Sequence, residues 1–111
     1  VPITRRSTAP CSEAAVVFAD VDDTPSVATG NFFESGAATE TITFFDGGVI
    51  GQVITVVSKA AITYTPSSEF RCGSAPVVTA DGDLTRWTRI SATQWQMIRF
   101  IDMTADQSGG V

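Results

Sequence analysis

The sequence contains no histidine. Histidine is the usual general base near neutral pH, so its absence excludes Ser-His-Asp and Cys-His catalysis together with histidine-ligated metal sites. The chain has only 2 cysteines, too few for a Cys/His zinc site with four ligands. The commonest enzyme mechanisms are therefore excluded, and we expect a protein that is not an enzyme and has no catalytic residues, no cofactor and no metal.

Charged residues and long apolar runs are also scarce. Only 17% of the residues are charged, against about one quarter in an ordinary domain. The formal net charge is −5 and the 7 Lys and Arg residues are scattered, so neither nucleic acid nor an anionic membrane surface is an expected partner. No apolar run approaches the roughly 18 residues of a membrane helix, so we expect no membrane insertion. A surface wetted mainly by Thr, Ser and Gly suits assembly with a partner.

A chain of 111 residues has the size of one domain. We predict an N-terminal arm or linker with a first strand over residues 1–24, a β-domain over 25–103 and a flexible C-terminal tail over 104–111. The first residue is Val1 instead of Met, which suggests a fragment of a longer polypeptide. Cys11 and Cys72 either close one long disulfide loop or remain small buried thiols, and the sequence leaves both possibilities open.

The strongest secondary-structure signals are two blocks, residues 42–57 and 84–101. Each contains two runs of β-branched and aromatic residues around a short turn with Gly or Ser/Thr, which predicts a β-hairpin. The nearly continuous apolar run from Val53 to Val57 predicts a central strand covered on both faces. No segment keeps a helical period for more than two turns. The sequence thus predicts an all-β domain, a β-sandwich or jelly-roll-like fold of about seven to eight short strands.

Acidic and glycine residues concentrate in predicted turns. Two carboxylates could flank a glycosidic bond, but Asp is common in turns because it bonds the local backbone, so turn roles are favoured. The spacing of the aspartates in residues 20–24 is similar to the start of an EF-hand calcium loop. However, Pro25 occupies the sixth position, where that loop needs Gly, and no Glu occupies the twelfth. Gly47-Gly48 lacks the Lys and helix of a phosphate-binding loop. The aspartates concerned are Asp20, Asp22, Asp23, Asp46, Asp81 and Asp83.

The candidate carbohydrate-binding residues are Tyr64, Trp87 and Trp95, an aromatic platform for a sugar ring, with Arg86 and Arg89 as flanking donors. Both tryptophans lie in predicted strands among Ile, Met and Phe, so a place in the core or an interface is favoured over sugar binding.

Neither face of the last two predicted strands is cleanly apolar. Strict alternation along residues 94–101 puts Arg99 on the same side as Trp95 and leaves large apolar groups on both sides. A single copy of this size would leave some of them exposed, so the pattern favours assembly.

Six motifs follow one another in a characteristic order: Asn31-Phe32-Phe33, Ile42-Thr43-Phe44-Phe45, Gly47-Gly48, Gly51-Gln52-Val53-Ile54-Thr55-Val56, Asp81-Gly82-Asp83-Leu84 and Trp95. In this order they resemble the C-terminal β-domain that follows the β-helix in bacteriophage tailspike and tail-fibre (receptor-binding) proteins. The resemblance covers about residues 25–101, and residues 70–73 depart from the Ile/Leu-rich strand of that pattern.

The resemblance implies a non-catalytic homotrimerisation domain that attaches to a bacterial surface polysaccharide. The domain is expected to be non-catalytic because catalysis in such proteins belongs to the preceding β-helix. The resemblance also implies a place in the virion tail after synthesis in the host cytoplasm. Two alternatives stay open: a monomeric carbohydrate-binding module, and a small glycan-processing or autocleaving domain that uses Asp and Ser residues.

Overall fold

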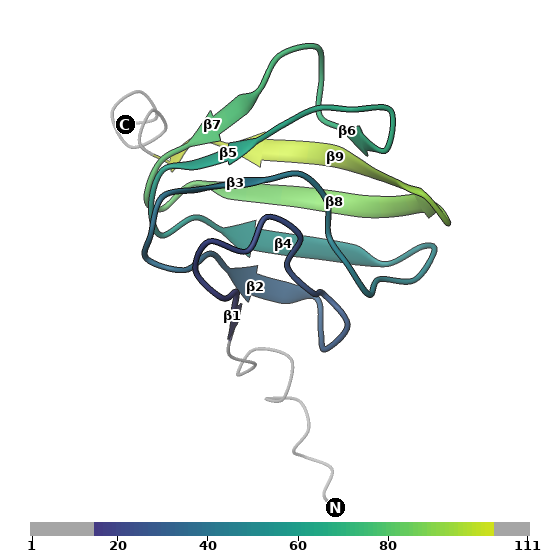
Figure 1. The fold of residues 1–111 in the computed structure, drawn as a ribbon, viewed down its shortest axis with the longest axis horizontal. Coiled ribbons are helices and arrows are strands. Elements are labelled where there is room, and N and C mark those ends of the chain that lie inside the picture. Colours follow the sequence, from purple (N-terminus) through teal and green to yellow (C-terminus); the bar gives the residue numbers. More distant parts are fainter. Residues whose placement is uncertain (1–14, 104–111) are drawn as a thin grey trace, which may run out of the picture.

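The computed structural model describes residues 15–103, and all nine elements in this range are strands. A six-stranded sheet has the order β1-β2-β4-β8-β9-β6, and a three-stranded sheet has the order β3-β5-β7 (Figure 1). The all-β prediction is confirmed, with nine strands instead of seven or eight, and the two sheets are compatible with a β-sandwich. The strands are β1 (Val16–Val17), β2 (Phe32–Glu34), β3 (Glu40–Ile42), β4 (Val53–Val57), β5 (Ile62–Tyr64), β6 (Phe70–Arg71), β7 (Val77–Thr79), β8 (Leu84–Ser91) and β9 (Gln94–Ile101).

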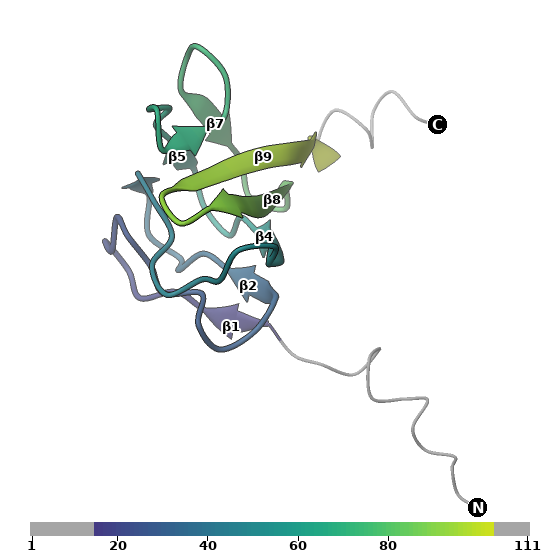
Figure 2. The ribbon, with the colours of Figure 1, turned by 90° about the vertical axis from the view of Figure 1, so that its right-hand side faces the viewer.

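In the first half of the fold the chain winds so that its strands pair in parallel, and this region is called here the parallel coil. Strand β1 pairs in parallel with β2, β2 with β4, and β3 with β5. A parallel pair needs a crossover of a dozen or more residues, because the chain must return to the same end of the sheet. Two of these three crossovers contain a strand of the other sheet: β3 lies between β2 and β4 in the chain, and β4 lies between β3 and β5. The chain therefore winds back and forth between the two sheets, whose separation is visible in Figure 2.

The coil also includes residues 16–24, which belong to the segment predicted to hold an arm or linker and a first strand. The backbone N–H of Thr43 donates to the carbonyl of Asp23 at 2.8 Å, and that of Thr65 donates to the carbonyl of Ile42 at 3.1 Å. Phe18 is buried in the core. Residues 16–24 are thus part of the fold, while the predicted arm over residues 1–12 and tail over 104–111 lie outside the described residues.

The two predicted hairpins have opposite outcomes. Strands β8 and β9 form an antiparallel pair closed between Ser91 and Gln94, so that hairpin is confirmed. The hairpin predicted over residues 42–57 is wrong, because β3 and β4 lie in different sheets and the segment between them crosses from one sheet to the other. Strand β4 does lie inside its sheet, but only one face is covered: Ile54 is fully buried whereas Val53 is 37% exposed.

An aromatic cluster fills the space between the sheets. The ring of Phe45 lies edge-on to Trp87 and Trp95, with centroids 5.2 and 5.4 Å away, and Phe70 stacks on Trp87 at 4.3 Å. The indole N–H of Trp95 donates to the carbonyl of Phe45 at 3.0 Å, so the buried polar atom is satisfied. Gly48 lies against the Trp95 ring, where a Cβ would approach the ring carbon Cζ2 to 2.5 Å. The glycine is needed for this close approach.

Candidate functional site

The surface that could bind a partner is the face of the six-stranded sheet that points away from the aromatic core, called here the outer face. Residues paired across neighbouring strands point to the same side, so the register defines three rows. None of these residues is buried, so no second layer of residues 15–103 covers the outer face. The first row is Phe32, Thr55, Arg86 and Arg99; the second is Val53, Thr88, Gln96 and Arg71; the third is Glu34, Val57, Leu84 and Ile101.

The outer face gathers arginines that are far apart in the sequence. Residues 15–103 contain five Lys and Arg side chains, and Arg71, Arg86 and Arg99 share this face. Arg86 and Arg99 are direct cross-strand partners, and both are exposed. Three of the five described cations, which are far apart in the sequence, therefore lie on one face of the sheet.

The position of Arg99 corrects the alternation expected along the last strand. The register between β8 and β9 shifts between Arg86 and Trp87, so Trp87 pairs with Met97 while Arg86 pairs with Arg99. The extra residue, Ile98, forms a β-bulge that reverses the alternation beyond it. Arg99 consequently lies on the face opposite Trp95.

An apolar cluster, called here the end patch, lies where β4 begins and β8 ends. Its members are Val49, Ile50, Val53 and Ile90, which are 67%, 66%, 37% and 43% exposed. The backbone N–H of Gly51 donates to the carbonyl of Arg89 at 2.8 Å, which holds the 49–51 loop beside β8. The end patch therefore gathers four exposed aliphatic side chains at one end of the six-stranded sheet.

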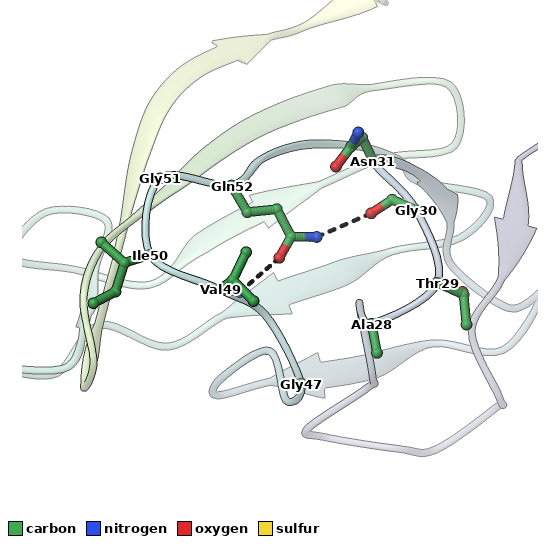
Figure 3. A pocket seen from close by; sticks show the side chains of 9 residues that line it. All are labelled: Ala28, Thr29, Gly30, Asn31, Gly47, Val49, Ile50, Gly51 and Gln52. Carbon is green, nitrogen blue, oxygen red and sulfur yellow. Dashed lines mark hydrogen bonds between the residues drawn. The ribbon is translucent and has the colours of Figure 1, made fainter.

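An open depression of about 520 Å³ lies beside the end patch between the 28–31 and 47–52 loops (Figure 3). Gln52 fixes its shape: its side-chain amide donates to the carbonyls of Val27 and Gly30, each at 2.9 Å, and its Oε1 accepts the N–H of Val49 at 2.9 Å. No titratable residue lines this depression. Gln52, which belongs to one of the sequence motifs, thus joins two successive turns of the coil through its side-chain amide.

The aromatic residues predicted to bind a sugar are in the core. Tyr64, Trp87 and Trp95 have no exposed surface. Burial raises the pKa of Tyr64 to about 12, because the phenolate would lose its hydration. A sugar-stacking platform needs an exposed ring, so the platform prediction does not fit these positions, and the core role favoured for the tryptophans is the one observed.

The two arginines predicted to flank that platform lie on opposite faces. Arg86 is on the outer face, whereas the guanidinium of Arg89 lies over the rings of Phe44 and Trp95, 5.7 and 5.8 Å from their centroids. Arg89 also donates to the carbonyl of Gly48 at 3.0 Å and to those of Ser91 and Ala92. Its donors are occupied by the hairpin turn and the 48–52 loop, so Arg89 has a structural role.

The aspartates expected in turns are partly engaged by the backbone. In the 81–83 turn, Gly82 has a positive φ of 97°, and the carboxylate of Asp83 accepts N–H groups from Ala80 at 2.8 Å and Met103 at 3.0 Å. Asp22 accepts the N–H of Thr24 at 3.0 Å. Within residues 15–103, no group of three or more His, Cys, Asp and Glu side chains is arranged to hold a metal ion.

Glu40 is the exception among the acids. It is 8% exposed, and neither carboxylate oxygen has a hydrogen-bond partner of good geometry. Burial raises the pKa of Glu40, the nearby charges of Asp20 and Asp22 raise it further, and the backbone N–H groups of Val21 and Asp22 oppose the shift. Sequence patterns gave no sign of this group, because Glu40 occupies an ordinary position at the start of a predicted strand.

Cys72 is a free, half-buried thiol whose pKa is raised by burial. Its Sγ lies 3.9 Å from the carbonyl oxygen of Tyr64. The possible partner Cys11 lies outside the described residues.

No protein-family model matches the chain, and no curated protein matches it. Within residues 15–103, no helix has the length and apolar character required to cross a membrane. The resemblance to phage tail proteins therefore depends on the motif order alone.

Proposed function

We propose that this chain is a non-catalytic β-domain of a phage tailspike or tail fibre, which assembles as a homotrimer and attaches the virion to a bacterial surface polysaccharide. The single observation that carries the proposal is the end patch beside an outer face that no described residue covers. Exposed aliphatic clusters of this kind are typical of contact surfaces, because burial against a partner removes them from water.

The parallel coil supports the same proposal. Successive turns stack β1 on β2 and β2 on β4, which is the winding of a β-helix. The antiparallel β8–β9 hairpin then ends this winding within the six-stranded sheet. Such an arrangement suits a domain that follows a β-helix, as the motif order implies.

The alternatives have less support. A monomeric sugar-binding module acting through Tyr64, Trp87 and Trp95 would need rings that are exposed, and all three are fully buried. A glycan-processing domain acting through Asp81 and Asp83 would need a free acid pair, but the Asp83 carboxylate is bonded to two backbone N–H groups.

Sedimentation velocity on matched variants tests the proposal. Val53→Glu places a charge in the end patch and is expected to convert the trimer to single copies, because a carboxylate cannot be buried there without a partner. Val78→Glu is the control, since Val78 is 61% exposed on the three-stranded sheet, and this variant is expected to remain trimeric. A wild-type chain that sediments as one copy, or a Val53→Glu variant that stays trimeric, would contradict the proposed assembly surface.

A further inference from the structure

We infer that the arginine cluster on the outer face, made of Arg71, Arg86 and Arg99, binds an acidic polysaccharide through its carboxylate groups. The inference rests on the proposed attachment function and specifies both the position of the glycan site and the charge of the glycan. It differs from the predicted aromatic platform in using the opposite face of the sheet.

The first argument is the pairing of two like charges. Arg86 and Arg99 are opposite each other across β8 and β9, where side chains are closest, and like charges in that position are unfavourable. Neither guanidinium has an ion-pair or hydrogen-bond partner within residues 15–103. A bound carboxylate would accept hydrogen bonds from both groups and remove their repulsion.

The second argument is the position of Arg71. Arg71 lies on β6 and pairs with Gln96 of the neighbouring strand β9, in the row next to that of Arg99. Arg99 lies in the next row of the outer face along β9, because the bulge at Ile98 turns it to the same side as Gln96. The cluster therefore offers guanidinium groups at more than one point, as a polymer with repeated carboxylates requires.

The third argument is the rest of the surface. Thr55 is the direct cross-strand neighbour of Arg86 in the first row. In the second row, Gln96 lies between Thr88 and Arg71. These side chains donate and accept hydrogen bonds and could meet sugar hydroxyls. The acid of the outer face is Glu34, which lies on β2, two strands away from Arg86. The chain is acidic overall, with a net charge of −5, but this part of the outer face is locally cationic.

Isothermal titration calorimetry with the full chain tests the inference. The probes are polygalacturonate, alginate and hyaluronan, with dextran as the neutral control. We expect binding to at least one acidic polymer, no binding to dextran, and weakening with added salt, because exposed ion pairs are screened. The inference would be overturned if the wild-type chain bound none of the three acidic polymers.

Variants then locate the site. The double variant Arg86→Gln/Arg99→Gln is expected to bind the acidic polymer at least tenfold more weakly. Lys59→Gln removes one exposed charge from the loop after β4 and is expected to bind within twofold of wild type. Equal affinity of the double variant and wild type would place the glycan elsewhere and overturn the inference.

The oligomeric state separates this inference from the proposed assembly. The double variant is expected to keep the wild-type sedimentation coefficient. Loss of the trimer in this variant would mean that the arginines contact another copy, which would overturn the glycan site while leaving assembly intact. Glycan binding by a chain that sediments as single copies would instead support the site and contradict the trimer.

Discussion

The two faces of the six-stranded sheet are built from alternate residues of the same strands, yet they differ in nearly every property. The inner face carries Phe33, Ile54, Trp87 and Trp95, all fully buried in the hydrophobic core. The outer face carries threonines, arginines and half-exposed aliphatic residues, none of them buried. The contrast teaches that the inner face supplies the packed core, whereas no residue of 15–103 covers the outer face.

The largest expected difference in stability between the two faces is at two neighbouring phenylalanines on β2. Phe33→Ala removes a fully buried ring that stacks on Phe18 at 5.2 Å, and we expect a loss of about 3–5 kcal/mol in the free energy of unfolding. Phe32→Ala changes the next residue on the outer face, and its expected loss is about 1 kcal/mol. Urea unfolding followed by tryptophan fluorescence at one protein concentration measures the free energy of unfolding of both variants. Equal losses would show that the two faces contribute equally to stability.

Gly48→Ala tests how tightly the inner aromatic cluster is packed. The new Cβ would approach Trp95 Cζ2 to 2.5 Å and Gln52 Oε1 to 2.8 Å, so we expect a loss of about 1–3 kcal/mol in stability. Trp95→Phe removes the contacting part of the ring, and in that background Gly48→Ala should cost less. A double-mutant cycle with no coupling between the two positions would show that the loss comes from the backbone instead of the ring.

Glu40→Gln tests the acid that is buried without a partner. Because the pKa of Glu40 in the folded state is raised above 4.5, the folded protein holds its proton more firmly than the unfolded chain, and ionisation destabilises the fold as the pH rises. The variant should therefore be more stable than wild type at pH 7, by on the order of 1 kcal/mol, and its advantage should shrink below pH 4.5.

Thermal unfolding across pH 4 to 7 measures this difference, and Glu34→Gln on the outer face controls for removal of one charge. A Glu40→Gln advantage that is largest at the acidic end would contradict the assigned state of Glu40.

Arg86→Gln should have the smallest effect on folding. Arg86 is exposed and has no ion-pair partner within residues 15–103, so we expect a change of no more than about 0.5 kcal/mol, with a slight gain from relief of the repulsion by Arg99. Urea unfolding of the isolated variant provides the measurement. A loss above about 1 kcal/mol would mean that the outer face also supports the fold.

The sequence revealed local pairings and missed distant ones. The β8–β9 hairpin was predictable because its strands are adjacent in the chain and joined by a short turn. The parallel coil was not, because Val16 pairs with Phe33 and Phe33 pairs with Val56, and these unequal separations leave no constant repeat in the sequence. The loops that connect the sheets vary in length, which conceals the winding.

The candidate site was only partly predictable for a related reason. Tyr64, Trp87 and Trp95 have the chemistry of a sugar platform, but burial is decided by tertiary packing. Arg86 was included among the candidate residues, whereas Arg71 and Arg99 join it only through the short strand β6 and the bulge at Ile98. Neither feature has a clear pattern in the sequence, so the cluster became visible only in the folded chain.

The most direct test of the account is the native mass of the full wild-type chain at micromolar concentration. We expect a particle of three copies of the 11.7 kDa chain, because the exposed end patch is proposed to be buried between copies. A particle of one copy that persists as the concentration is raised would show that the end patch is stable in water without a second copy, and would contradict the proposed homotrimer.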